Sequence, residues 1–80
     1  MDVSTAAPPS FARVADELSA PLLRYLARYV GDRQVAEDLL QETRLRIARG
    51  LPGFEQRSTL TTWAFSIATR VAADHYRQPA

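Results

Sequence analysis

Three side chains with carboxylate or amide groups lie close together in the middle of the chain: Asp38, Gln41 and Glu42. Residues three and four positions apart share one face of an α-helix, so these groups would form one acidic, hydrogen-bonding surface. Carboxylates and amide oxygens accept hydrogen bonds from arginine and lysine, so the surface suits a basic partner. On the chemistry alone, a solvated helix face with incidental charges is the simpler interpretation.

A second group of polar side chains recurs at helical spacing in the last third of the chain. It consists of Thr62, Ser66, Thr69, Arg70 and Arg77. Hydroxyl and guanidinium groups on one side of a helix could contact phosphates and base edges. Trp63 and Phe54 could stack on an unpaired base, an interaction worth roughly 1–3 kcal/mol per base. Core packing is the simpler role for Trp63, whereas Phe54 fits either role.

Catalytic constellations are weak in this sequence. Cysteine is absent and His75 is the one histidine, which argues against thiolate chemistry, histidine-rich metal sites and nucleophilic triads. Asp74 precedes His75 directly, and adjacent helical residues do not face each other. The three glycines form no phosphate-binding loop. We therefore expect a binding protein that is not an enzyme and carries no cofactor or metal.

The charge changes sign along the chain. Residues 1–42 contain four arginines against seven acids, and residues 43–80 contain six arginines against two acids. The balance is −3 in the first part and +4 in the second, although the whole chain carries only +1. This asymmetry suggests two different partners, one of them a nucleic acid.

The elements that must position these groups are helices. Apolar residues recur every three or four positions through residues 11–30, as in an amphipathic helix. Pro21 interrupts this stretch, so it is either one helix or two, over about 11–18 and 20–30. Gly31 should end the helix in a left-handed conformation.

Two further helices are expected. Asp32 is a suitable N-cap for the second, which Gly50 should stop. The third should start at Ser58 or Thr59 and reach about Gln78. Nothing alternates with period two, and 80 residues allow one small domain. The sequence predicts an all-α fold, a compact bundle of three main helices.

The N-terminal segment, residues 1–10, is small, polar and proline-containing, and we expect a disordered lead-in. It has neither the basic start nor the apolar centre of a signal peptide. No apolar run approaches the length of a transmembrane helix. We expect a cytoplasmic protein without membrane insertion.

Several blocks of residues resemble bacterial sigma-70-family factors. The stretch Gly31-Asp32 with Ala36-Glu37-Asp38-Leu39-Leu40-Gln41-Glu42 resembles region 2.2. Leu51, Phe54, Ser58, Thr62-Trp63, Ile67-Ala68, Asp74 and Arg77 resemble regions 2.3 and 2.4 in residue type and spacing. The short spacing between the blocks is similar to that of the extracytoplasmic-function group. The resemblance covers about residues 11–78, so residues 11–80 are expected to form a sigma region 2 domain.

The resemblance implies a transcription initiation factor domain. RNA polymerase core would bind through the clamp helices of its β′ subunit, at Asp38, Gln41, Glu42, Arg44 and Leu45. The domain would recognise and melt the promoter −10 element by holding the non-template strand. The residues implied in DNA binding are Phe54, Arg57, Ser58, Thr59, Thr62, Trp63, Ser66, Arg70 and Arg77.

Two features depart from the family pattern. Arg70 stands where the family usually has asparagine near the base-binding pocket, which bears on −10 sequence preference. The second helical domain, which binds the −35 element in this group, is absent from this chain, so we expect a region 2 domain cut from a longer protein. An alternative is a protein-interaction module without independent DNA binding, held by an anti-sigma factor, a partner that the resemblance implies.

Overall fold

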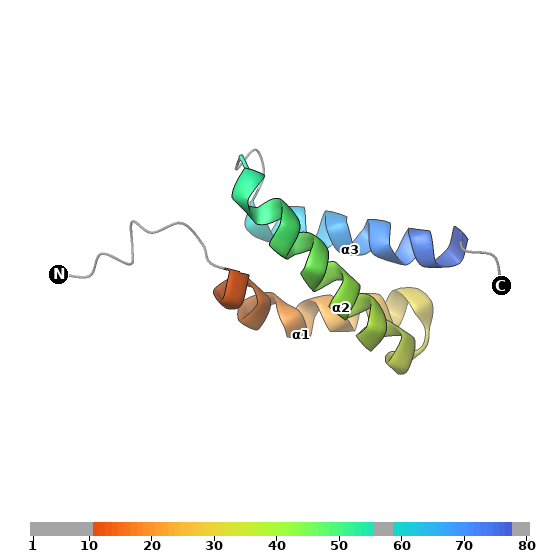
Figure 1. Cartoon of the computed structure of the whole chain (residues 1–80). Coiled ribbons are helices and arrows are strands. Elements are labelled where there is room, and N and C mark those ends of the chain that lie inside the picture. Colours follow the sequence, from red (N-terminus) through yellow and green to blue (C-terminus); the bar gives the residue numbers. More distant parts are fainter. Residues whose placement is uncertain (1–10, 56–58, 78–80) are drawn as a thin grey trace.

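The computed structural model describes residues 11–55 and 59–77. Three helices, α1 (Phe11–Val30), α2 (Arg33–Gly50) and α3 (Leu60–Arg77), contact one another in every pairing, and the short 3-10 helix η2 (Leu51–Gly53) follows α2. Figure 1 shows α1 and α3 side by side, with α2 crossing them obliquely. These described ranges contain no strand, so the all-α expectation is confirmed. The expected lead-in over residues 1–10 lies outside them.

The first helix is continuous through Pro21, so the alternative of a break there is wrong. Proline lacks the N–H that would donate to the carbonyl of Glu17, and a proline inside a helix costs about 3 kcal/mol. Leu22 and Leu26, on the turns that follow, are almost completely buried. Burying each leucine stabilises the fold by about 1.5–3 kcal/mol, which offsets the cost of the proline.

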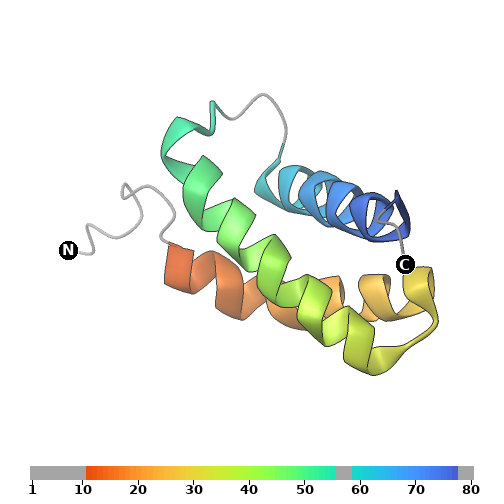
Figure 2. The same ribbon diagram turned by 45° about the vertical axis from the view of Figure 1, so that its right-hand side comes forward.

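A tight turn joins α1 to α2 and makes them an antiparallel pair, as Figure 2 shows. Gly31 has a φ of 74°, the left-handed conformation expected for it, and its N–H donates to the Ala27 carbonyl at 2.8 Å. Asp32 is extended, and its side chain accepts a hydrogen bond from the Val35 N–H at 3.1 Å. Both the glycine cap and the aspartate N-cap are therefore confirmed.

The third helix is capped in the same way. Thr59 precedes α3, and its hydroxyl oxygen accepts a hydrogen bond from the Thr62 N–H at 3.1 Å. Helix α3 therefore starts at Leu60, one residue after the expected boundary. At its far end, the Tyr76 hydroxyl donates to the Tyr29 carbonyl at 3.3 Å, which satisfies a carbonyl at the C-terminal end of α1.

A small apolar core lies between the three helices. The buried apolar residues are Leu22, Leu26, Ala36, Leu40, Ile47, Ala64, Ile67, Ala68, Val71 and Ala72. Three of the alanines follow one another at four-residue steps on α3, and their small side chains let the neighbouring helices approach closely. The buried Thr43 hydroxyl donates to the Leu39 carbonyl at 2.8 Å, so it is satisfied within α2. This core fixes which faces of α2 and α3 point outwards.

Candidate functional site

One candidate surface is the α2 outer face, which we define as Asp38, Gln41, Glu42 and Leu45. Asp38 and Gln41 are exposed, and Glu42 is partly exposed. Leu45 follows Asp38, Gln41 and Glu42 by seven, four and three positions, so the polar groups lie on the same face, toward the N-terminal end of α2. Its exposed fraction is 52%, and it is the one leucine that is exposed among the described residues. The face thus presents an exposed apolar side chain with hydrogen-bonding groups beside it.

The remaining residue of the implied polymerase set, Arg44, lies beside this face. Consecutive helical residues are rotated by roughly 100°, so Arg44 points away from the direction of Leu45. Its side chain is half-buried. The structure therefore brings four of the five implied residues onto one surface and leaves Arg44 at its side.

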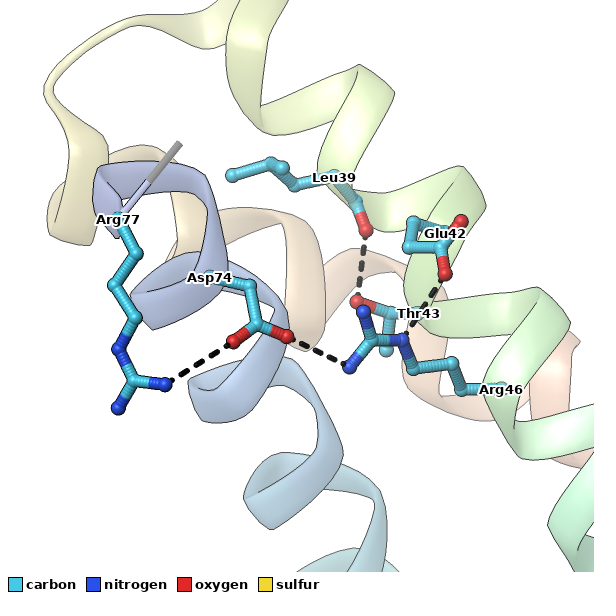
Figure 3. A network of polar contacts seen from close by, with 6 residues as sticks. All are labelled: Leu39, Glu42, Thr43, Arg46, Asp74 and Arg77. Atoms are coloured by element: carbon cyan, nitrogen blue, oxygen red, sulfur yellow. Dashed lines mark hydrogen bonds and ion pairs between the residues drawn. The ribbon is translucent and has the colours of Figure 1, made fainter. Parts of the chain in front are cut away.

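Glu42 already has a partner within the chain. The Arg46 Nε lies 3.0 Å from its Oε2, and Arg46 Nη1 lies 3.2 Å from Asp74 Oδ2 on α3, as drawn in Figure 3. Arg77 Nη1 lies 3.8 Å from the other Asp74 oxygen. The hydrogen bond to Glu42 raises the pKa of Arg46; burial opposes this rise, and the contact with Asp74 adds to it. A permanently charged guanidinium therefore joins the two helices.

Arg46 was not among the residues singled out from the sequence. Its spacing of four from Glu42 is a signal for an ion pair on a helix. Its contact with Asp74 depends on how α2 and α3 pack, which spacing along the chain does not reveal. The carboxylate of Asp74 is 44% exposed and binds two arginines.

A second candidate surface is the α3 outer face, which we define as Thr62, Ser66, Thr69, Arg70 and Arg77. All five residues are exposed, as their spacing predicts. Ser66 donates its hydroxyl proton to the Trp63 carbonyl at 2.6 Å, and Thr69 donates its proton to the Phe65 carbonyl at 2.9 Å. These two hydroxyls therefore present lone pairs outwards rather than protons.

The Thr69 hydroxyl has a second partner, Tyr25 on α1, with 2.8 Å between the two oxygens. A hydroxyl carries one proton, and that of Thr69 already lies on the Phe65 carbonyl. Tyr25 is therefore the donor in this pair. At the start of α3, the Thr59 hydroxyl donates to the Thr62 oxygen at 2.8 Å, which leaves the proton of Thr62 available.

The two aromatic residues considered for base stacking lie on each other. The ring centroids of Phe54 and Trp63 are 4.9 Å apart, with an angle of 32° between the ring planes. Both are half-buried, and Trp63 also packs against the core, which confirms the core-packing role weighed for it; base stacking stays a prediction. A β-carbon built on Gly50 would lie 2.9 Å from Trp63 Cζ2. Gly50 does end α2, as expected, and its lack of a side chain makes room for the indole.

The remaining implied DNA contacts include both described residues and residues outside the described ranges. Arg70, at the position where the family usually has asparagine, is exposed on α3. Arg57 and Ser58 lie outside the described residues. Thr59 lies at the N-terminus of α3, beside Thr62. The structure thus places Arg70 on α3 and Thr59 directly before it.

Two further observations concern the described residues as a whole. No three histidine, aspartate or glutamate side chains among them converge in a way that could hold a metal ion. None of the described helices combines the length and apolar character of a membrane span.

Comparison with known proteins identifies the family. The family profile described as Sigma-70 region 2 matches residues 15–80. The ECF RNA polymerase sigma factor SigX of Bacillus subtilis is 38% identical over 69 residues, which cover 86% of this chain and 36% of that protein. SigC, an ECF RNA polymerase sigma factor of Mycobacterium tuberculosis, is 46% identical over 54 residues, which cover 68% of this chain and 29% of that protein.

A third relative, the ECF RNA polymerase sigma factor BldN of Streptomyces coelicolor, is 36% identical over 69 residues, which cover 85% of this chain and 26% of that protein. The chain thus spans about a third or less of the length of these curated relatives. No solved structure gives a significant match. The helical fold, the family profile and these relatives together show that the chain belongs to the sigma-70 family, as a region 2 domain of the extracytoplasmic-function type.

Proposed function

We propose that this domain acts in transcription initiation by joining RNA polymerase core to the promoter −10 element. The α2 outer face binds the clamp helices of the β′ subunit, and the α3 outer face with Phe54 and Trp63 holds the non-template strand. The relatives are named as RNA polymerase sigma factors, which supports this role. The observation that carries the proposal is the exposed Leu45 with carboxylate and amide groups beside it.

The polymerase contact follows from the chemistry of that face. A half-exposed leucine loses its contact with water when a partner helix covers it, and apolar burial contributes about 25 cal/mol per Å². The carboxylate of Asp38 and the amide of Gln41 accept hydrogen bonds from basic side chains around it. Glu42 joins them once a partner cation replaces or shares the guanidinium of Arg46.

Calorimetric titration with a purified β′ clamp-helix fragment tests this contact. Asp38→Ala and Leu45→Ala should each weaken binding about fivefold or more, the level of a residue that contributes over 1 kcal/mol to an interface. Glu37→Ala is the matched control, because Glu37 is an exposed carboxylate on α2 that pairs with Arg33 instead. Equal binding by all three variants and the wild type would remove the α2 outer face from the interface.

The proposed DNA contact combines hydrogen-bond donors for the phosphates with aromatic rings that stack on a base. Phosphate oxygens accept hydrogen bonds, so the guanidinium of Arg70 and the free proton of Thr62 are the donors that suit them. An extruded base would enter beside Trp63 by displacing or extending the stack with Phe54. Extrusion costs a few kcal/mol, which stacking and hydrogen bonds would offset.

Fluorescence anisotropy with a labelled single-stranded −10 oligonucleotide tests the DNA contact. Phe54→Ala and Arg70→Gln should both lower the affinity. Arg49→Gln is the control, because Arg49 is an exposed arginine on α2 that is not among the residues assigned to the DNA contact. If polymerase binding is normal and DNA binding is absent even at low salt, the domain is instead a protein-interaction module of the kind held by an anti-sigma factor.

A further inference from the structure

A hollow on α1 lies outside both faces described above. Its cavity volume is about 520 Å³, and it is open to solvent. It is lined by Pro21, Arg24, Tyr25, Arg28 and Tyr29, which we call the α1 hollow. The lining contains two arginines, two tyrosines and no acid, so it is a basic and aromatic surface.

The two arginines of the α1 hollow are available to a ligand. Arg24 and Arg28 are exposed, and neither makes an ion pair within the described part of the chain. Other arginines are already engaged with carboxylates; these are Arg13, Arg33, Arg46 and Arg77. The spacing of four between Arg24 and Arg28 places their guanidinium groups one helical turn apart on the same side.

The tyrosines are held in place by aromatic neighbours. The Tyr25 ring lies edge-on to Phe65 of α3, with centroids 5.4 Å apart, and 5.9 Å from the Tyr29 ring. The ring centroids of Tyr29 and Tyr76 are 6.1 Å apart, with an angle of 34° between the ring planes. Because these contacts already fix the rings, a ligand would lose little binding energy in ordering them.

The α1 hollow is continuous with the α3 outer face. The Tyr25 hydroxyl, on the wall of the hollow, donates to Thr69 at 2.8 Å, so the two surfaces meet at this hydrogen bond. A strand that lies along α3 and crosses Thr69 would reach Arg24 and Arg28 next. Figure 1 shows α1 and α3 running side by side, as this path requires.

We propose that the α1 hollow binds the sugar–phosphate backbone of the single-stranded DNA that leaves the α3 outer face. This inference rests on the proposed function, since it extends the DNA path assigned there. Arg24 and Arg28 each contact a phosphate, and the exposed part of Tyr29 packs on a sugar or a base. Planar guanidinium groups fit phosphates with two hydrogen bonds, and alternation of arginine with aromatic rings is typical of surfaces that bind single strands.

The salt dependence of binding tests this proposal. Each phosphate contact on a single strand contributes about 0.7 to the slope of log affinity against log salt. The double variant Arg24→Gln/Arg28→Gln should therefore lower the slope by about 1.4 and weaken binding roughly 25-fold near 0.1 M salt. The probe is a fluorescently labelled single-stranded oligonucleotide long enough to span both helices. A longer oligonucleotide should lose more affinity than a short one that covers α3 alone.

Three further variants make the result decisive. Arg49→Gln changes the same charge on α2 and should leave the slope unchanged, and circular dichroism checks the fold of each variant. Arg24→Lys/Arg28→Lys keeps both charges, so it should retain most of the slope while losing some affinity. Arg70→Gln reports on α3 and should lower the slope by about 0.7.

The outcomes separate this inference from the proposed function. If Arg70→Gln lowers the slope and the double glutamine variant does not, the α1 hollow is not a DNA site, while the DNA contact of α3 stands. If the wild type binds no oligonucleotide at low salt, both DNA proposals fail, and the calorimetric titration still tests the polymerase contact separately. If the double glutamine variant keeps its DNA affinity but loses binding to polyglutamate, the α1 hollow takes an acidic protein instead.

Discussion

The outer faces of α2 and α3 differ in how much of their polar chemistry is already used within the chain. On α2, Asp38 and Gln41 are exposed and make no hydrogen bond or ion pair with their side chains in the described residues. On α3, the protons of Ser66 and Thr69 are bound to carbonyl groups one turn earlier. Asp38 and Gln41 are therefore ready for a partner, whereas the hydroxyls of Ser66 and Thr69 must rearrange before they can donate.

This difference separates two kinds of recognition. A ready face binds with little reorganisation, so its affinity follows from area and charge. A face whose hydroxyl protons are committed offers phosphates mainly its arginines, since phosphate oxygens need donors. We therefore expect the α2 outer face to bind first and more tightly. DNA binding should depend on Arg70 and on the α1 hollow more than on the hydroxyls.

The largest effect should come from Leu26→Ala, which damages the support shared by both faces. Leu26 is fully buried, and leucine to alanine changes in a core cost about 2–5 kcal/mol. A domain of this size has only about 4–12 kcal/mol in total, so the loss is large. Urea unfolding followed by circular dichroism measures it. Polymerase binding at wild-type strength by an unfolded variant would show that the α2 outer face does not depend on the bundle.

The two N-caps provide a matched pair that sharpens the comparison. Asp32 caps α2 and Thr59 caps α3, each accepting a backbone N–H at 3.1 Å. Asp32→Ala and Thr59→Ala should each lower the free energy of unfolding by about 0.5–2 kcal/mol. Among the molecules that remain folded, only those of the Thr59→Ala variant should also bind the oligonucleotide more weakly. Equal losses of DNA affinity in both variants would mean that the effect is one of stability alone.

Gly50→Ala should act on the aromatic pair without touching the α2 outer face. Its new β-carbon would lie 2.9 Å from the Trp63 ring, and overpacking of this kind costs about 1–3 kcal/mol. Alanine is favoured over glycine inside a helix by about 0.5–1 kcal/mol, so the net loss should be about 1 kcal/mol.

Gly53→Ala is the control for this change, since a β-carbon there meets nothing within 4 Å. Thermal unfolding of the two variants should therefore differ, and only Gly50→Ala should weaken DNA binding. Normal stability and DNA affinity in Gly50→Ala would show that Trp63 moves aside easily and that its position on Gly50 is not needed.

The smallest effect should come from the charges that join the two helices. Arg46 and Asp74 are 35% and 44% exposed, so solvent screens their attraction. A double-mutant cycle with Arg46→Gln and Asp74→Asn should give a coupling of about 0.2–1 kcal/mol, which salt reduces. If the coupling is zero, the contact does not link the outer faces energetically. Arg46→Gln should also free the carboxylate of Glu42 and so change the affinity of the domain for the clamp-helix fragment.

Local signals along the chain predicted the fold well. Gly31 and Asp32 predicted the turn between α1 and α2. Gly31 did so through its backbone freedom and Asp32 through its capping side chain, and both effects act over a few residues. Pro21 was harder, because whether a helix survives a proline depends on what the following turns bury. Burial of Leu22, directly after Pro21, favours the continuous helix over a break at the proline.

The candidate site was predictable in outline but not in its hydrogen bonds. Helical spacing placed Asp38 and Arg70 on outer faces correctly. The engagement of Ser66 with its own helix had a signal too, because serine and threonine inside helices often donate to the preceding turn. The contacts of Arg46 with Asp74 and of Tyr25 with Thr69 join residues far apart in sequence, so only packing of the helices reveals them.

The position of Trp63 also gives the domain a built-in optical probe. It is the one tryptophan of the chain, and its indole lies on Gly50 and against the Phe54 ring, where the loop meets α3. Emission excited at the indole band therefore reports on this junction alone, without a label. Rapid mixing experiments could follow entry of a base next to Trp63 as it happens, and separate that step from the earlier arrival of the strand.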